Sequence, residues 1–269
     1  MQHPQRAAEL IWQHLVSGEP MGGLPDDLRP ASRAEGYAIQ ACLVQTGGQV
    51  AVRGWKIAAT SEAGREHIGV SAPLAGRIMA PFVHAPGATL PTLGNRMGVA
   101  ELEFAFVMGV TLPPRPEEYA VQEVLDAVAG ICPAIEVPSS RFDDFVHAGE
   151  AQLIADLACA GHFVFGEPGP ADWRTLDLRA HPVHGTILRA GQPVLERTGS
   201  GVNVLGDPRL ALTWLTNELS HQGIALEAGQ VVSTGTCMVP MTIEAGDEIH
   251  GDFGVLGRIQ AGFGRPGDA

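Results

Sequence analysis

The beginning of the chain places apolar residues at the three- and four-residue spacing of a helix. Residues 5–17 carry one apolar face, made of Ala8, Ile11, Trp12, Leu15 and Val16. A stretch rich in glycine and proline, 19–30, interrupts the pattern, and Ser32 with Glu35 three residues later is typical of the start of a second helix. The pattern predicts a small N-terminal helical part, residues 1–48.

From Val50 onward the pattern changes to short alternating segments separated by glycine and proline. We expect strands at 99–110, 133–137, 162–166, 183–189 and 230–236, with one last strand between Gly246 and Phe263. Helices are expected at 119–130 and 148–160. The clearest helix has Asp207 as N-cap, Pro208 at its first position and Gly223 as its stop. The predicted class is α+β.

Composition narrows the partners and the compartment. The net charge of −13 argues against nucleic acid and anionic membrane as partners. The four cysteines are far apart and form no CxxC pair, which indicates reduced thiols. The chain begins without a secretory signal pattern and has no apolar run long enough for a membrane span, so we expect a cytoplasmic protein.

Three glutamates lie in apolar strand segments. Glu101 and Glu103 are two residues apart, so their side chains leave the same face of a strand with Cα atoms about 7 Å apart. Glu136 is a third carboxylate in an apolar strand. If the three converge, a hard divalent cation is needed to balance them, and Mg²⁺ or Mn²⁺ suits such ligands better than Zn²⁺. The spacing also allows a solvent-facing pair of glutamates with Glu136 unrelated.

Lys56 is the only lysine of the chain, and its sequence neighbours are Trp55 and Ile57. An amine among apolar groups is desolvated and can titrate near neutrality, which a guanidinium cannot. Lys56 is therefore a candidate for general acid or base chemistry. The alternative is that a composition poor in lysine left one behind.

Several motifs in order resemble the hydratase/decarboxylase branch of the fumarylacetoacetate hydrolase superfamily, typified by 2-keto-4-pentenoate hydratases. The resemblance covers nearly the whole chain. Its motifs are Glu35-Gly-Tyr-Ala-Ile-Gln40, Gly54-Trp-Lys-Ile-Ala-Ala-Thr-Ser61, Ile68-Gly-Val70, Glu101-Leu-Glu-Phe-Ala-Phe-Val107, Pro133-Ala-Ile-Glu-Val137, Ser140-Arg141, Leu205-Gly-Asp-Pro208, Trp214-Leu-Thr-Asn217 and Val232-Ser-Thr-Gly235.

The resemblance implies a fold, a cofactor and a reaction. The fold would be a mixed β roll with flanking helices, formed by a catalytic domain at 49–269 beside the N-terminal helical part, in a dimer or larger homo-oligomer. Glu101, Glu103 and Glu136 would hold Mg²⁺ or Mn²⁺, with Lys56 in the active site. The reaction would be the addition of water to a short 2-hydroxy-dienoate or 2-oxo-enoate from aromatic-ring cleavage, and the resemblance also allows an association with a pathway partner enzyme.

The sequence departs from the family pattern at three polar positions, where Leu74, Ser139 and Leu157 replace an acid, an aspartate and an asparagine. Without the acid at Leu74, Glu66 and His67 are the candidates to handle a second proton.

Four further residues are candidates for binding substrate. Arg65 and Arg141 could meet its carboxylate, and Thr234 with Gly235 would end a strand in the pocket.

Three other functions remain open at this point. A 2-oxo-enedioate decarboxylase would use the same electron sink. A hydrolase of acylpyruvates would need a water-activating pair, but adjacent Glu66 and His67 would point apart in a strand. The lost polar groups would also suit a non-catalytic paralogue that binds metal and oxo-acids.

Overall fold

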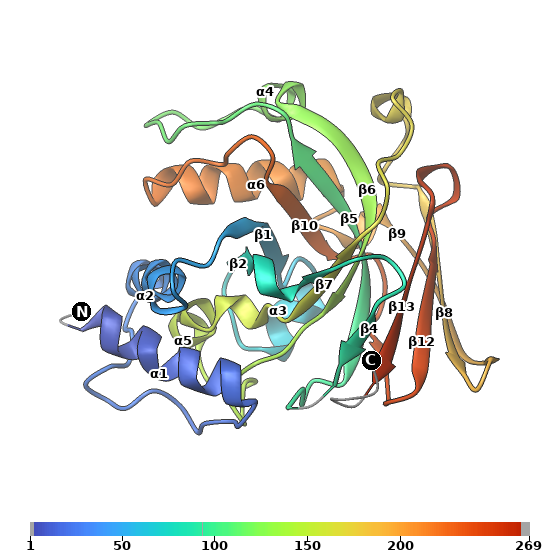
Figure 1. Cartoon of the computed structure of the whole chain (residues 1–269). Coiled ribbons are helices and arrows are strands. Elements are labelled where there is room, and N and C mark those ends of the chain that lie inside the picture. Colours follow the sequence, from blue (N-terminus) through green and yellow to red (C-terminus); the bar gives the residue numbers. More distant parts are fainter. Residues whose placement is uncertain (1–2, 93, 265–269) are drawn as a thin grey trace.

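Two β-sheets packed face to face form the body of the molecule in the computed structural model, which describes residues 3–92 and 94–264 (Figure 1). The large sheet has the order β2-β1-β10-β5-β6-β7-β3, and β11 also pairs with β5. Its strands are β2 (Leu74–Met79), β1 (Val52–Ala58), β10 (Val231–Thr236), β5 (Val99–Met108), β6 (Val128–Val137), β7 (His162–Phe165), β3 (Val83–His84) and β11 (Met241–Thr242).

The second sheet has the order β4-β13-β12-β8-β9. Its strands are β4 (Thr89–Pro91), β13 (Arg258–Gly264), β12 (Asp247–Asp252), β8 (Pro182–Arg189) and β9 (Gln192–Ser200). Leu102 of β5 packs against the bare backbone of this sheet, since a Cβ on Gly185 or Gly251 would lie 2.9 Å or 2.8 Å from its side chain. The apolar face of β5 therefore builds the core between the sheets, and its other face is free for chemistry.

Most helices gather around the β1–β2 end of the large sheet (Figure 1). They are α1 (Pro4–Ser17), α2 (Arg33–Thr46), α3 (Glu62–His67), α4 (Val121–Asp126), α5 (Glu150–Ala155) and α6 (Pro208–His221). The predicted caps are confirmed: the Ser32 hydroxyl accepts from the backbone N–H of Glu35, and the Asp207 carboxylate accepts from that of Arg209. Gly223 follows α6 with φ of 71°, as a helix stop requires.

The helix predicted at 119–130 is too long, because its last residues belong to a strand. Strand β6 begins at Val128, which pairs with Met108 of β5, so the sheet takes over these residues. The segment between Gly246 and Phe263 forms two strands, β12 and β13, and β9 was not predicted. In these segments, pairing with neighbouring strands outweighs the local sequence pattern.

The helix predicted at 148–160 is also wrong in its second half. Helix α5 ends at Ala155, and Leu157, Ala158 and Cys159 then adopt positive φ angles. None of the helices within 3–92 and 94–264 is long and apolar enough to cross a membrane.

Candidate active site

Glu101, Glu103 and Glu136 converge on one face of the large sheet, as expected from the alternation of β5. Glu101 is the direct cross-strand partner of Glu136, and Glu103 follows two residues later on the same face. One oxygen from each carboxylate lies within 4.8 Å of the others. Glu103 and Glu136 are fully buried and Glu101 is half-buried. The alternative of a solvent-facing pair is therefore wrong.

Strand β10 fixes one of these carboxylates from the side. Glu103 Oε2 accepts hydrogen bonds from the Ser233 hydroxyl at 2.6 Å and from the backbone N–H of Gly235 at 2.9 Å. Its other oxygen, Oε1, is buried without a hydrogen-bond donor within the described part of the chain. Ser233 was not among the residues predicted for the site, although it lies two residues before Gly235 and so shares its face.

Glu136 depends on Lys56 for compensation. Its Oε1 lies 2.9 Å from the Lys56 ammonium as an ion pair, and neither of its oxygens receives a well-directed hydrogen bond from the described residues. Buried carboxylate oxygens without donors fit the ligand set of a hard divalent cation such as Mg²⁺. The donor set therefore fits the expected metal.

The single ammonium of Lys56 does not balance the negative charge of the three carboxylates. The pKa of Glu101 is raised to about 8, by burial first and then by the nearby Glu103 carboxylate, against the opposing effect of Lys56. Burial likewise raises the pKa of Glu136 well above its usual value, against the attraction of Lys56. With one ammonium beside them, Glu101 and Glu136 favour their protonated forms unless another cation joins the cluster.

The environment of Lys56 differs from the one expected. Its neighbours Trp55 and Ile57 point to the opposite face of β1, because strand side chains alternate. The amine instead faces the carboxylates. Burial lowers the pKa of Lys56, but the charges of Glu136, Glu101 and Glu103 outweigh burial and raise this pKa above its ordinary value. The expectation of an amine titrating near neutrality is therefore wrong for this arrangement.

Gly235 and Thr234, both expected to bind substrate, have different surroundings. Gly235 lies where no side chain fits, and the Thr234 hydroxyl already has a hydrogen-bond partner in the protein. Gly235 has φ of 102°, and a Cβ there would approach the Thr60 hydroxyl to 2.3 Å. The Thr234 hydroxyl donates to the backbone carbonyl of Phe104 at 2.8 Å. Gly235 thus supports the site through its N–H, and Thr234 ties β10 to β5.

The two candidate arginines occupy different surroundings. Arg141 is buried, with its guanidinium bonded to the Asp156 carboxylate and to the backbone of Asp156 and Ala160. Arg65 is half-buried on α3 and its guanidinium reaches the carbonyl of Ala59, at the end of β1, at 3.5 Å. Arg65 has the freer guanidinium of the two.

Glu66 and His67 lie at the surface on α3, and the His67 ring rests edge-on against Phe145. Within the described residues no hydrogen bond or ion pair joins either of them to Lys56. Leu74, which stands where the family pattern has an acid, is fully buried on β2, two residues from Gly76, the cross-strand partner of Lys56. The apolar side chain therefore shares the face of the sheet that carries Lys56.

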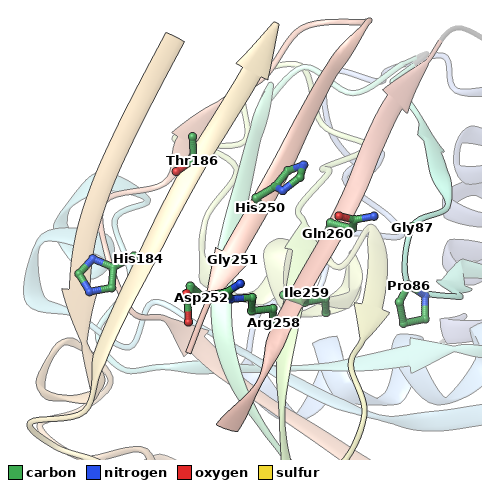
Figure 2. A pocket seen from close by; sticks show the side chains of 10 residues that line it. All are labelled: Pro86, Gly87, His184, Thr186, His250, Gly251, Asp252, Arg258, Ile259 and Gln260. Carbon is green, nitrogen blue, oxygen red and sulfur yellow. Dashed lines mark hydrogen bonds and ion pairs between the residues drawn. The ribbon is translucent and has the colours of Figure 1, made fainter. Parts of the chain in front are cut away.

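A hollow of about 680 Å³ lies away from these carboxylates, on the outer face of the second sheet (Figure 2). It is lined by Pro86, Gly87, His184, Thr186, His250, Gly251, Asp252, Arg258, Ile259 and Gln260. Asp252 is already bonded to the backbone of Gly254 and to Arg258. This open polar surface holds no member of the carboxylate cluster.

The sheet arrangement and the buried carboxylates define the class of protein. Residues 81–263 match the fumarylacetoacetate (FAA) hydrolase C-terminal family, and the chain belongs to this family. The resemblance seen in the sequence is thereby confirmed, as is the mixed-sheet fold.

Curated relatives of the chain are named hydratases. It is 30% identical over 264 residues to 2-keto-4-pentenoate hydratase of Paraburkholderia xenovorans (strain LB400), covering 97% of this chain and 95% of the relative. It is 30% identical over 218 residues to 2-oxo-hept-4-ene-1,7-dioate hydratase of Escherichia coli, covering 79% of each. Both relatives carry a hydro-lyase name, and they differ in the distal end of the named substrate.

A solved structure shares the fold over almost the whole chain. The 4-oxalocrotonate decarboxylase of Pseudomonas putida G7, complexed with magnesium and adipate, superposes with a TM-score of 0.84 at 24% identity, covering 97% of each chain. At this identity the likeness shows the fold alone.

Proposed function

We propose that the protein is a divalent-metal-dependent hydro-lyase that adds water to a short 2-hydroxy-dienoate or its 2-oxo-enoate tautomer. The observation that carries the proposal is the buried cluster of Glu101, Glu103 and Glu136 with one ammonium beside it. The names of the relatives support the reaction class, because two hydratases with different substrates share about the same identity with this chain.

The three glutamates would hold Mg²⁺ or Mn²⁺. When bound, this ion would act as a Lewis acid that stabilises negative charge on the carboxylate and C2 oxygen of the substrate. The chain supplies the rest: Ser233 and the N–H of Gly235 keep the Glu103 carboxylate turned toward the other two. In the 2-oxo-3-enoate tautomer, withdrawal of electrons toward the C2 oxygen makes C4 open to attack by water, and C3 takes up a proton, which gives a 4-hydroxy-2-oxo acid.

Lys56 is the proposed proton donor beside the substrate. Its pKa is raised by the carboxylates, so the amine is protonated at neutral pH and acts first as an acid and as a positive charge. The same cation stabilises the developing enolate. We propose Glu66 and His67 only as groups that exchange protons with solvent, since their side chains are exposed.

The first test is the ultraviolet decay of freshly generated 2-hydroxypenta-2,4-dienoate with protein and Mg²⁺, against an EDTA control. We expect metal-dependent loss of the diene with formation of 4-hydroxy-2-oxopentanoate. Lys56→Met should lower turnover by at least about 100-fold, the scale of a lost general acid. Arg53→Met, an exposed change on the same strand, is the matched control. Full turnover by Lys56→Met would refute the assigned role.

Decarboxylation of a 2-oxo-enedioate is the second candidate, supported by one feature of the site. Arg65, with one long hydrogen bond to Ala59, is the half-buried guanidinium that could meet a distal carboxylate. Arg141 is a poorer candidate for this contact, because Asp156 already neutralises it. Arg65→Met should raise KM for a dicarboxylic substrate and leave KM for the pentadienoate unchanged if the alternative is correct.

We also propose a compartment, an assembly and a source of substrate for the enzyme. We place it in the cytoplasm as a homo-oligomer that acts on a product of aromatic-ring cleavage. Analytical ultracentrifugation tests the assembly, and metal analysis of protein purified without added ions tests the choice of Mg²⁺ over Mn²⁺.

A further inference from the structure

The backbone after α5 has an unusual conformation beside Lys56. Leu157, Ala158 and Cys159 have φ angles of 57°, 51° and 60°, and all three are buried. Residues with a side chain avoid this left-handed region because Cβ crowds the following carbonyl. Three such residues in succession persist only where the surrounding structure holds them there.

Asp156 and Arg141 hold both ends of this left-handed turn. The buried Asp156 carboxylate accepts from the Ser140 hydroxyl at 2.7 Å, from the backbone N–H of Arg141 at 3.0 Å and from the Arg141 guanidinium. The guanidinium also donates to the carbonyls of Asp156 and Ala160, which flank the turn. Asp156 directly precedes the turn, but its partners Ser140 and Arg141 lie 16 and 15 residues before it, which explains why the local pattern predicted a helix at these positions.

Strand β2 provides the surface against which the turn packs. Gly76 is the cross-strand partner of Lys56, and a Cβ at Gly76 would lie 1.9 Å from the carbonyl oxygen of Leu157. The φ of Gly76 is not positive, so this position requires glycine for space. The turn therefore fills the place of a side chain next to Lys56.

This packing brings one carbonyl to the amine. Lys56 Nζ donates to the carbonyl oxygen of Ala158 at 3.1 Å and lies 2.9 Å from Glu136 Oε1. An ammonium has three N–H donors, so two anchors define its position and leave one donor for a substrate.

We propose that Gly76 and Asp156 are positioning residues for Lys56: they hold the left-handed turn 157–159, and the turn aims the amine through the carbonyl of Ala158. The importance for catalysis rests on the proposed function, whereas the position of the amine does not. The inference thus deepens the role of Lys56 and can be tested without any substrate.

The single lysine makes a direct test possible. Protein labelled with [¹⁵N]lysine has one side-chain ammonium to observe by NMR, and its hydrogen exchange reports how well the amine is held. In Gly76→Ala we expect a changed Nζ resonance and exchange faster by about tenfold or more, as local protection is lost. Gly130→Ala is the matched control, since Gly130 also lies in the large sheet and an added Cβ would meet nothing within 4 Å.

An unchanged Lys56 resonance and exchange rate in folded Gly76→Ala would overturn the proposal. If Gly76→Ala does not fold, Asp156→Asn is judged by the same criterion, because it keeps the size of the side chain and removes the charge that Arg141 meets. In the diene assay, Gly76→Ala should lower kcat more than it changes KM. If the wild-type protein fails to hydrate the diene, the proposed function fails while the NMR result still decides this inference.

Discussion

Glu103 is the carboxylate that the protein orients most completely. Two donors from β10 bond its Oε2, and its Oε1 is buried without a donor within the described residues. Glu136 lacks such donors and relies on the Lys56 ammonium. The cluster thus contains one oriented ligand and one ligand that shares its charge with an amine, and the two respond differently to substitution.

Glu103→Gln should separate metal affinity from stability. The amide oxygen can still accept from Ser233 and Gly235, while the negative charge that raises the pKa of Glu101 disappears, so we expect the free energy of unfolding of the metal-free protein to rise by about 1 kcal/mol. Affinity for Mg²⁺ should fall at least about 100-fold, more than the loss of an outer partner causes. Calorimetric titration and denaturant unfolding in EDTA measure the two quantities. Unchanged Mg²⁺ affinity would remove Glu103 from the proposed ligand set.

Gly235→Ala should disturb the same carboxylate through the backbone. Its φ of 102° and the 2.3 Å approach of a Cβ to the Thr60 hydroxyl force β10 to move. We expect a loss of about 2–4 kcal/mol in the free energy of unfolding, with weaker Mg²⁺ binding because the N–H leaves Glu103. Gly262→Ala on β13, where the nearest atom would be 3.5 Å from the Cβ, is the control. Equal losses in both variants would contradict the steric argument.

The residue scale also shows where sequence reasoning reaches its limit. Alternation along β5 predicted that Glu101 and Glu103 share a face, because that rule depends only on the strand itself. The environment of Lys56 could not be found from Trp55 and Ile57, since neighbours in a strand point away from each other. Its real neighbours, Glu136 and Ala158, come from β6 and from the turn after α5.

At the scale of elements, the short pairing of β3 with β7 forms one edge of the large sheet. A ring nitrogen of His84 lies 2.9 Å from one of His162, and the Phe82 ring contacts His162 edge-on. The pKa of His162 is lowered to about 4, by burial first and then by the charges of His84 and Arg141. The edge is therefore built for two neutral imidazoles.

Acidification should weaken the protein through this edge. Unfolded His162 takes up a proton near its ordinary pKa of 6.5, while the folded residue does so only near 4. Between these values the unfolded state binds more protons, so the free energy of unfolding falls as pH falls, by at most about 1.4 kcal/mol per pH unit for one proton. His162→Gln should flatten this decline, measured by urea unfolding from pH 7.5 to 4. His250→Gln on β12 serves as control, and an unaltered slope in His162→Gln would contradict the prediction.

The elements that sequence predicted well are those with local signals. Helix α6 begins and ends where Asp207, Pro208 and Gly223 indicate, because caps act within a few residues. The segment after Ala155 carries good helix formers, yet it leaves the helix. Its left-handed turn depends on Arg141 and on the space at Gly76. Both residues are distant from the turn in sequence, so a pattern of neighbouring residues could not predict the turn.

At the scale of the whole molecule, the order of strands gathers the site from distant segments. Strand β10 lies between β1 and β5, so the carboxylates of β5 and β6 meet the amine of β1 and the backbone of β10. The second sheet covers the opposite face of β5 through Leu102, so the carboxylates lie on the face that this sheet does not cover. The fold thus collects like charges at one place in a protein whose net charge is already −13.

Because these carboxylates lie together, the free energy of unfolding should depend on both pH and Mg²⁺. Glu101, with a pKa raised to about 8, holds a proton in the folded metal-free state that an unfolded glutamate releases near 4.5. The folded state then binds more protons, so the contribution of this group to stability is complete below pH 4.5 and is lost as pH rises through 8.

Mg²⁺ should displace the proton, stabilise the protein and bind more tightly as pH rises. Calorimetry at pH 7 in buffers of different ionisation enthalpy should show release of about one proton per Mg²⁺, because the ion replaces it among the carboxylates. Binding without proton release, or metal-free stability that is constant from pH 6 to 9, would mean that the three carboxylates do not share charge as their geometry indicates.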